Sequence, residues 1–299
     1  MSQYSFHSTQ KMLELCQELN LDLADLCLKR EMEIIDQSAD HIESVLRHRL
    51  NVMEKSIFNS LQNPRETMGK MGGKIAYNLQ KYLEENGYKE LMMGELAIKA
   101  AMYSIANNEN NACMGCIVAC PTAGASGVVP GVLFATKEYF HWTEEQMMKA
   151  LLVAAGLGSV IAFNATVSGA EGGCQAEIGS AVAMAAAALT YLRKGTPEQC
   201  MQAAALSLKN LLGLACDPIG GMVEVPCIKR NGFAAQYALL GSDLAIMGVK
   251  SYIPLDEIID SMRNIGNEMN ANIRETALGG LAATKTAQTT CQNLGIIIK

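Results

Sequence analysis

The sequence of 299 residues is poor in the residues that favour β-strands. Aromatic residues make up 5% of it, tryptophan occurs once, and prolines number seven. Ala, Leu and Met dominate instead, which is a helix-forming composition. The formal net charge of −6 is spread along the chain without a basic tract, so we do not expect nucleic acid as a partner. We predict an all-α protein.

Signals for export and for a membrane span are also missing. Residues 1–7 lack the apolar core of a signal peptide. Residues 150–170 carry no charge, but Gly, Ser and Asn interrupt this window, and isolated polar side chains are costly in lipid. We predict a buried central helix there, in a cytoplasmic protein that does not enter a membrane.

Ten cysteines without an export signal are not expected to form a disulfide framework. Cys16, Cys27, Cys200 and Cys291 lie on helix-like stretches and read as core or surface thiols. The other six form two sets close to Gly or Pro, and both sets are candidate metal ligands.

The first set is Cys113, Cys116 and Cys120, followed by Pro121. Its spacing copies the tail of the bacterial ferredoxin motif C-x2-C-x2-C-x3-C-P, but one cysteine is missing and no second run exists. Spacings of three and four residues would place the three thiols on one face of a helix. Spacing alone favours this set, and with it an iron–sulfur electron carrier or redox sensor.

The second set is dispersed and consists of Cys174, Cys216 and Cys227. Cys174 follows two glycines and precedes an Ala-rich run, and a thiol at the start of a helix is biased toward the thiolate. The other two cysteines also lie beside Gly or Pro. Three such thiolates could hold an iron–sulfur cluster, while a zinc-stabilised helical scaffold without catalysis is the alternative.

Cap residues and apolar periodicity divide the rest of the chain. Ser38 is expected to cap a helix that ends at residues 63–64 and carries an apolar stripe, Ile42, Leu46, Leu50, Met53 and Ile57. We predict an N-terminal helical hairpin region, residues 1–64, and a second helical domain, residues 65–299, which carries both candidate cysteine sets. Other helices are predicted over 11–20, 22–36, 75–85, 90–105 and 178–192, with further helix starts at Thr143 and Thr196 and a short strand at 222–225.

A small-residue loop at 121–127 follows a cluster of amides at 107–111. Its hydroxyls and backbone N–H groups could form a nest for a carboxylate. The alternative is a tight turn between packed helices.

Six ordered blocks of the sequence resemble the α subunit of the iron–sulfur-dependent L-serine dehydratases of the two-subunit bacterial type. The resemblance covers nearly the whole chain, and its blocks are 111–124, 127–131, 171–181, 216–221, 225–231 and 269–282. Residues 67–73 depart from the Ser-Gly-x-Thr-Gly-Gly-like stretch usual in this family, which leaves the amino-acid substrate open.

The resemblance implies a helical fold around a [4Fe–4S] cluster held by Cys174, Cys216 and Cys227. Three ligands leave one iron open as a Lewis acid for the β-hydroxyl of L-serine, which is converted to pyruvate and ammonia. A β subunit is expected to complete the site and supply the base, in an oligomeric assembly. Nothing indicates pyridoxal phosphate. Elimination from another small amino acid such as L-cysteine is the alternative. Substrate contacts are expected at Asn111, Thr122, Gly124 and Ser126.

Overall fold

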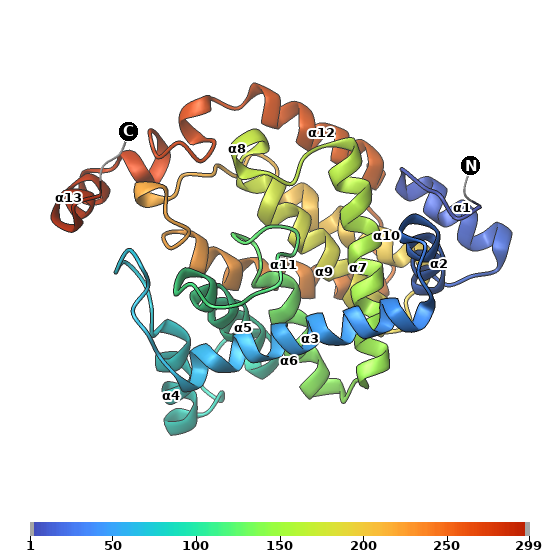
Figure 1. Cartoon of the computed structure of the whole chain (residues 1–299), viewed down its shortest axis with the longest axis horizontal. Coiled ribbons are helices and arrows are strands. Elements are labelled where there is room, and N and C mark those ends of the chain that lie inside the picture. The colour runs from blue at the N-terminus through green and yellow to red at the C-terminus, as the bar shows by residue number, and fades with distance from the viewer. Residues whose placement is uncertain (1–2, 297–299) are drawn as a thin grey trace.

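The computed structural model describes residues 3–296, and within them the chain forms thirteen α-helices and no strand (Figure 1). The prediction of an all-α fold is confirmed. Met1 and Ser2, which belong to the stretch tested for a signal peptide, lie outside the described residues. The helices are α1 Thr9–Leu19, α2 Leu23–Ile35, α3 Ala39–Gln62, α4 Ile75–Asn86, α5 Gly94–Ala112, α6 Val128–Phe140, α7 Glu144–Asn164, α8 Gly169–Gly172, α9 Ser180–Leu192, α10 Pro197–Leu208, α11 Cys227–Ile246, α12 Leu255–Glu268 and α13 Lys285–Leu294.

Helix α9 is the centre of the core. All of its residues except Tyr191 are buried, and seven of the thirteen are Ala or Val. A helix that is apolar on every side must be covered on every side. Helices α6, α7, α10 and α11 pack around it (Figure 1). The small alanine side chains allow the close approach of these neighbours.

Helix α7 is long and apolar enough to cross a membrane by length and composition alone. In the fold, 67% of its most apolar window is buried, and it packs against α2, α3 and α9. It is therefore a core helix, as predicted. The predicted capping box at Thr143 is present, but the helix ends at Asn164 and does not continue to residue 170.

The three N-terminal helices match their predictions within three residues at each end. Ser38 accepts a hydrogen bond from the backbone N–H of His41, and the predicted stripe of α3 is buried. Through this face α3 packs against α5 and α7. The division of the chain at residue 64 stays a prediction.

Two predicted elements are wrong. Residues 222–225 are not a strand but a tight turn, in which the Glu224 N–H donates to the Met222 carbonyl, and the Glu224 carboxylate accepts hydrogen bonds from the 67–71 segment. A short apolar run without a neighbouring strand has no ladder to join. Helix α5 was predicted over 90–105 but spans Gly94–Ala112, because the amide side chains of its last turns are buried against other segments.

Candidate functional site

Cys174, Cys216 and Cys227 come together in one buried region, although they lie on three separate segments. Cys174 immediately precedes a π-helical turn at Gln175–Gly179, Cys216 lies in a loop, and Cys227 is the first residue of α11. Their exposed fractions are 3%, 3% and 8%. The Cys216 sulfur lies beside that of Cys174, and Cys227 is close enough to Cys174 for the two thiols to interact electrostatically.

The charges around these thiols shift their pKa values in different directions. The pKa of Cys174 falls below the ordinary thiol value because the Cys216 thiol donates to its sulfur, and the Arg230 guanidinium lies beside it. The same hydrogen bond, together with burial, raises the pKa of Cys216. Burial raises the pKa of Cys227 to about 12. Cys174 is therefore the thiol best prepared to act as a thiolate.

The donor set fits an iron–sulfur cluster better than a single metal ion. Three buried sulfur donors are the ligands that iron–sulfur clusters take. Among residues 3–296, no three His, Cys, Asp or Glu side chains converge as the ligands of one metal ion would. A four-iron cluster binds each thiolate on a different iron, so its ligands need not converge on one point.

The glycines before Cys174 have a steric role. Gly173 has a φ of +74°, and a Cβ there would lie 2.5 Å from the Met269 Sδ atom and 3.0 Å from the Leu214 carbonyl oxygen. Only glycine allows both this backbone conformation and this approach. The π-helical turn that follows is a feature often found at functional sites.

Glu177, in that π-helical turn, connects the cysteines to the 121–127 loop. Its Oε1 atom accepts a hydrogen bond from the Thr122 hydroxyl at 2.7 Å, and its Oε2 atom lies 3.6 Å from the Cys216 sulfur. Burial raises the pKa of Glu177, while the Thr122 hydroxyl opposes this shift. Sequence reasoning missed this residue. The available signal was a carboxylate three residues after Cys174, within a single turn.

The 121–127 loop turns its carbonyl oxygens toward buried amides. The Ala123 oxygen accepts from Asn108 and Asn111, each at 3.2 Å. The Gly124 oxygen accepts from Asn108 at 3.1 Å and from Asn231 at 2.8 Å. The backbone N–H groups of residues 123–125 donate no hydrogen bond to any other described residue. Ala123 is exposed and Gly124 is half-buried, so the N–H groups of these two residues are open to an anion, as in a nest, whereas Ala125 is buried.

The four residues predicted to bind substrate all lie at this loop, but they face different ways. Thr122 and Gly124 lie next to the carboxylate of Glu177. Asn111 donates to the loop backbone, and Ser126 is fully buried, with its hydroxyl accepting from Asn107. Asn111 and Ser126 therefore shape the loop. That any of the four residues contacts substrate stays a prediction.

Cys113, Cys116 and Cys120 do not share a helical face, so that prediction is wrong. Helix α5 ends at Ala112, and Met114, with a φ of +59°, turns the chain out of the helix. Cys113 lies against the Glu66 carbonyl, Cys116 is exposed, and Cys120 is buried, which raises its pKa to about 12. The three thiols have different surroundings, and a role for them in binding iron stays a prediction.

The remaining four cysteines, Cys16, Cys27, Cys200 and Cys291, are buried as predicted for core thiols. Burial raises the pKa of Cys16 to about 11 and that of Cys27 to about 12. Such buried, protonated thiols are poor nucleophiles.

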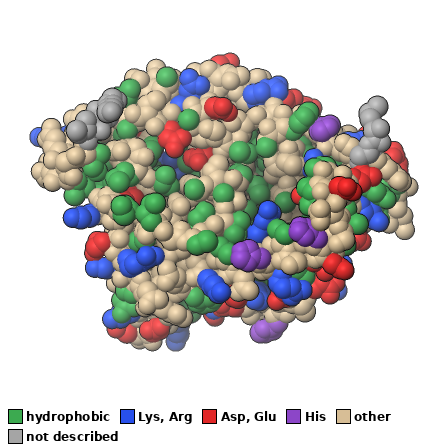
Figure 2. Space-filling view, in the orientation of Figure 1, with side chains coloured by type: hydrophobic (Ala, Val, Ile, Leu, Met, Phe, Trp, Pro, Cys, Tyr) green, Lys and Arg blue, Asp and Glu red, His purple; other side chains and the backbone are tan. Residues whose placement is uncertain are grey.

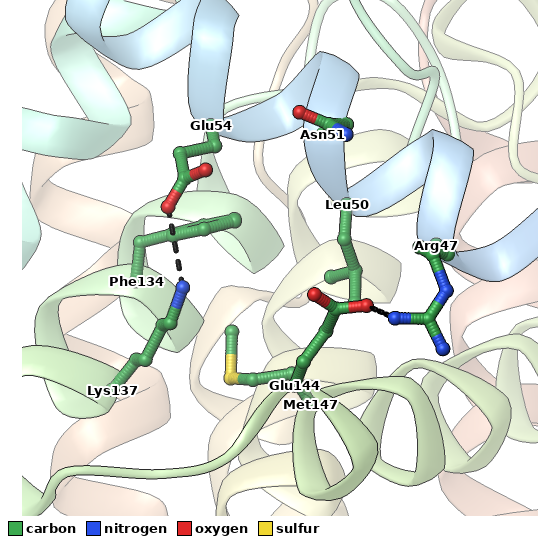
Figure 3. Close-up of a pocket in the computed structure, with 8 residues that line it drawn as sticks. All are labelled: Arg47, Leu50, Asn51, Glu54, Phe134, Lys137, Glu144 and Met147. Carbon is green, nitrogen blue, oxygen red and sulfur yellow. Dashed lines mark hydrogen bonds and ion pairs between the residues drawn. The ribbon is translucent and has the colours of Figure 1, made fainter.

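A separate surface pocket lies between α3, α6 and the start of α7 (Figure 3). Its charged groups pair with one another: Arg47 with Glu144, and Lys137 with Glu54 at 3.2 Å. No charge is left to recognise a ligand, so we assign no binding role to this pocket.

Comparison with known proteins identifies the family. The family model described as serine dehydratase alpha chain matches residues 18–282, a range that includes the three cysteines, Glu177 and the 121–127 loop. The chain belongs to the serine dehydratase alpha chain family. A probable L-serine dehydratase alpha chain of Bacillus subtilis is 44% identical over 95% of this chain and 93% of its own length.

Other members of the family differ in length. The L-serine dehydratase alpha chain of Peptoniphilus asaccharolyticus is 39% identical over 94% of this chain and 96% of its own length. L-serine dehydratase 2 of Escherichia coli is 35% identical over 93% of this chain, but only 62% of its own length is matched. The family thus includes chains of the present size and chains with a large additional part.

Proposed function

We propose that this chain is the α subunit of an L-serine dehydratase, which eliminates water from L-serine and yields pyruvate and ammonia. The observation that carries the proposal is Glu177, which touches both the three-cysteine site and the loop with free N–H groups. A small amino acid that spans these two features would have its carboxylate at the loop and its β-carbon toward the cysteines. Family membership and the names of the relatives support serine as that amino acid.

Cys174, Cys216 and Cys227 are the residues that would hold a [4Fe–4S] cluster. When bound, the cluster supplies an open iron, a Lewis acid that makes the β-hydroxyl of serine a better leaving group. The buried position of the three cysteines keeps bulk water away from the reacting groups.

The chain's own residues orient the amino acid. The N–H groups of Ala123 and Gly124 would bind the substrate carboxylate, while Asn108 and Asn231 hold the loop in the required conformation. Glu177 would accept a charge-assisted hydrogen bond from the α-ammonium group. Loss of the Cα proton and of the β-hydroxyl as water leaves aminoacrylate, which tautomerises to an imine and hydrolyses to pyruvate and ammonia.

The base that takes the Cα proton is proposed to come from a β subunit. The histidines of this chain, His7, His41, His48 and His141, are all exposed, and Figure 2 shows histidine side chains at the surface. His7 stacks on Phe163, and His141 is the C-cap of α6. The three cysteines are buried, so a histidine base at this site would have to be supplied by a partner.

An anaerobic assay with L-serine and L-cysteine tests the proposed reaction. With iron-loaded chain and its partner, we expect pyruvate from serine at a kcat/KM at least tenfold above that for cysteine. The physical reason is that hydroxide is a poor leaving group and needs a Lewis acid, whereas the thiol of cysteine would bind the open iron tightly and block it. Sulfide release from cysteine without pyruvate from serine would instead establish the alternative elimination and contradict the proposal.

Replacing Glu177 by Gln tests how the substrate is held. Hydrogen bonds to charged groups contribute about 1.5–3 kcal/mol, so loss of the charge should raise the KM for serine about 10–100-fold. Glu171→Gln is the matched control, because Glu171 lies in the same block but is exposed and bonded to Thr166. Iron content should be unchanged in both variants. An unchanged KM in Glu177→Gln would remove Glu177 from the ammonium site.

A further inference from the structure

One side chain joins the three segments that carry Cys174, Cys216 and Cys227. Arg230 lies in the first turn of α11, three residues after Cys227. Its Nη1 atom donates to the Ala215 carbonyl at 2.8 Å, and its Nη2 atom lies 3.3 Å from the Asp217 Oδ1 atom. The guanidinium also lies beside the Cys174 sulfur and lowers the pKa of that thiol. Arg230 therefore holds both neighbours of Cys216 and the sulfur of Cys174 at once.

The Cys216 segment is held from its other side by residues 273–281. The Cys216 N–H donates to the Ile273 carbonyl at 2.9 Å, and the Cys216 carbonyl accepts from the Glu275 N–H at 2.6 Å. The second carboxylate oxygen of Asp217 accepts from the Leu281 N–H at 2.8 Å. Asp217 thus links Arg230 to this C-terminal segment, and the loop around Cys216 is fixed between them.

Arg230 supplies a positive charge beside the three cysteines, where negative groups gather. The three thiols are buried, the half-buried carboxylate of Glu177 lies beside them, and Glu275 adds to the negative field at Cys216. Burying anions without a cation is costly. The side chain of Arg230 is 17% exposed and that of Asp217 is 8% exposed, so solvent screens this cation only in part. The nearby Arg274 directs its guanidinium to the Glu171 carbonyl.

We propose that Arg230 is a positioning residue of the three-cysteine site: it fixes the three thiols in one arrangement and slows the release of iron. The inference rests on the proposed ligand set. A planar guanidinium with several donors can serve three acceptors in different directions, whereas a lysine ammonium cannot span them. Removing a side chain that holds metal-binding residues in place typically lowers the metal affinity about 10–100-fold.

The test compares wild type, Arg230→Lys and Arg230→Met in an anaerobic chelator challenge after iron–sulfur reconstitution. Iron release is followed by the loss of visible absorption, and circular dichroism verifies the fold. We expect both variants to lose iron at least tenfold faster than wild type, and iron-loaded Arg230→Lys to keep a KM for serine within about twofold. Arg193→Met is the control, because Arg193 makes a similar contact with Asp243 at the other end of α11.

The outcomes separate this inference from the proposed function. If wild type takes up no iron, the proposed ligand set fails. If wild type takes up iron and both Arg230 variants release it at the wild-type rate, only the role of Arg230 fails. A raised KM with an unchanged release rate would also overturn it, since Arg230 would then contact substrate.

Discussion

Replacing Cys174, Cys216 or Cys227 by Ser is expected to abolish both iron binding and serine turnover in each single variant. A serine hydroxyl is a far weaker ligand for iron than a thiolate, and only three thiols are available to hold four irons. The measurement is iron and acid-labile sulfide per chain after anaerobic reconstitution, together with the visible absorption spectrum. Wild type should carry about four irons per chain.

Two control variants make this result specific. Cys200→Ala removes a fully buried thiol from α10, and it therefore reports the cost of disturbing the core alone. Cys116→Ser removes the exposed thiol of the ferredoxin-like set. Both should retain wild-type iron. If one of the three proposed ligand variants keeps its full iron content, that cysteine is not a ligand, and a loss of iron in Cys116→Ser would return the first cysteine set to consideration.

The two cysteine sets show how much of the candidate site could be predicted from the sequence. The spacing of Cys113, Cys116 and Cys120 predicts a shared face only if a helix continues through them. The helix ends at Ala112 because Met114 takes a left-handed conformation, which a non-glycine residue adopts only under local constraint. The spacing of the cysteines gives no sign that the helix ends at Ala112. The family resemblance, by contrast, pointed to the dispersed set, which packing does bring together.

Helix starts were predictable because their signals are local. Ser38, Thr143 and Thr196 each accept a hydrogen bond from a backbone N–H three residues later, as their side-chain chemistry requires. The conformation of the 121–127 loop could be predicted only in part. Its small residues suggested a nest, but Asn231 reaches the Gly124 carbonyl from 107 positions away in sequence. Such a contact depends on the packing of α11 against α5 and α6, which periodicity cannot supply.

The largest change in rate is expected when the β subunit is added. The isolated, iron-loaded chain should turn over serine poorly, and its partner should raise kcat about 10²–10⁴-fold, the usual contribution of a general acid–base group. In this chain all four histidines are exposed while the three cysteines are buried, and Glu177 is assigned to the α-ammonium group of the substrate. The relatives from Streptomyces coelicolor and Escherichia coli have 61% and 62% of their lengths matched, so their remaining parts are candidates for the same contribution.

The experiment mixes purified iron-loaded chain with purified partner under anaerobic conditions and measures the initial rate of pyruvate formation. Mixing the partner with Cys227→Ser chain is the control, and it should give no activity, since the partner alone lacks the proposed cluster ligands. The iron content of the wild-type chain must be equal before and after mixing, because a partner that merely protects the cluster would also raise the rate. Full activity of the isolated chain would show that the base belongs to this chain. Glu177 would then be the first candidate, because it is the only carboxylate of the described residues that contacts both Thr122 and Cys216.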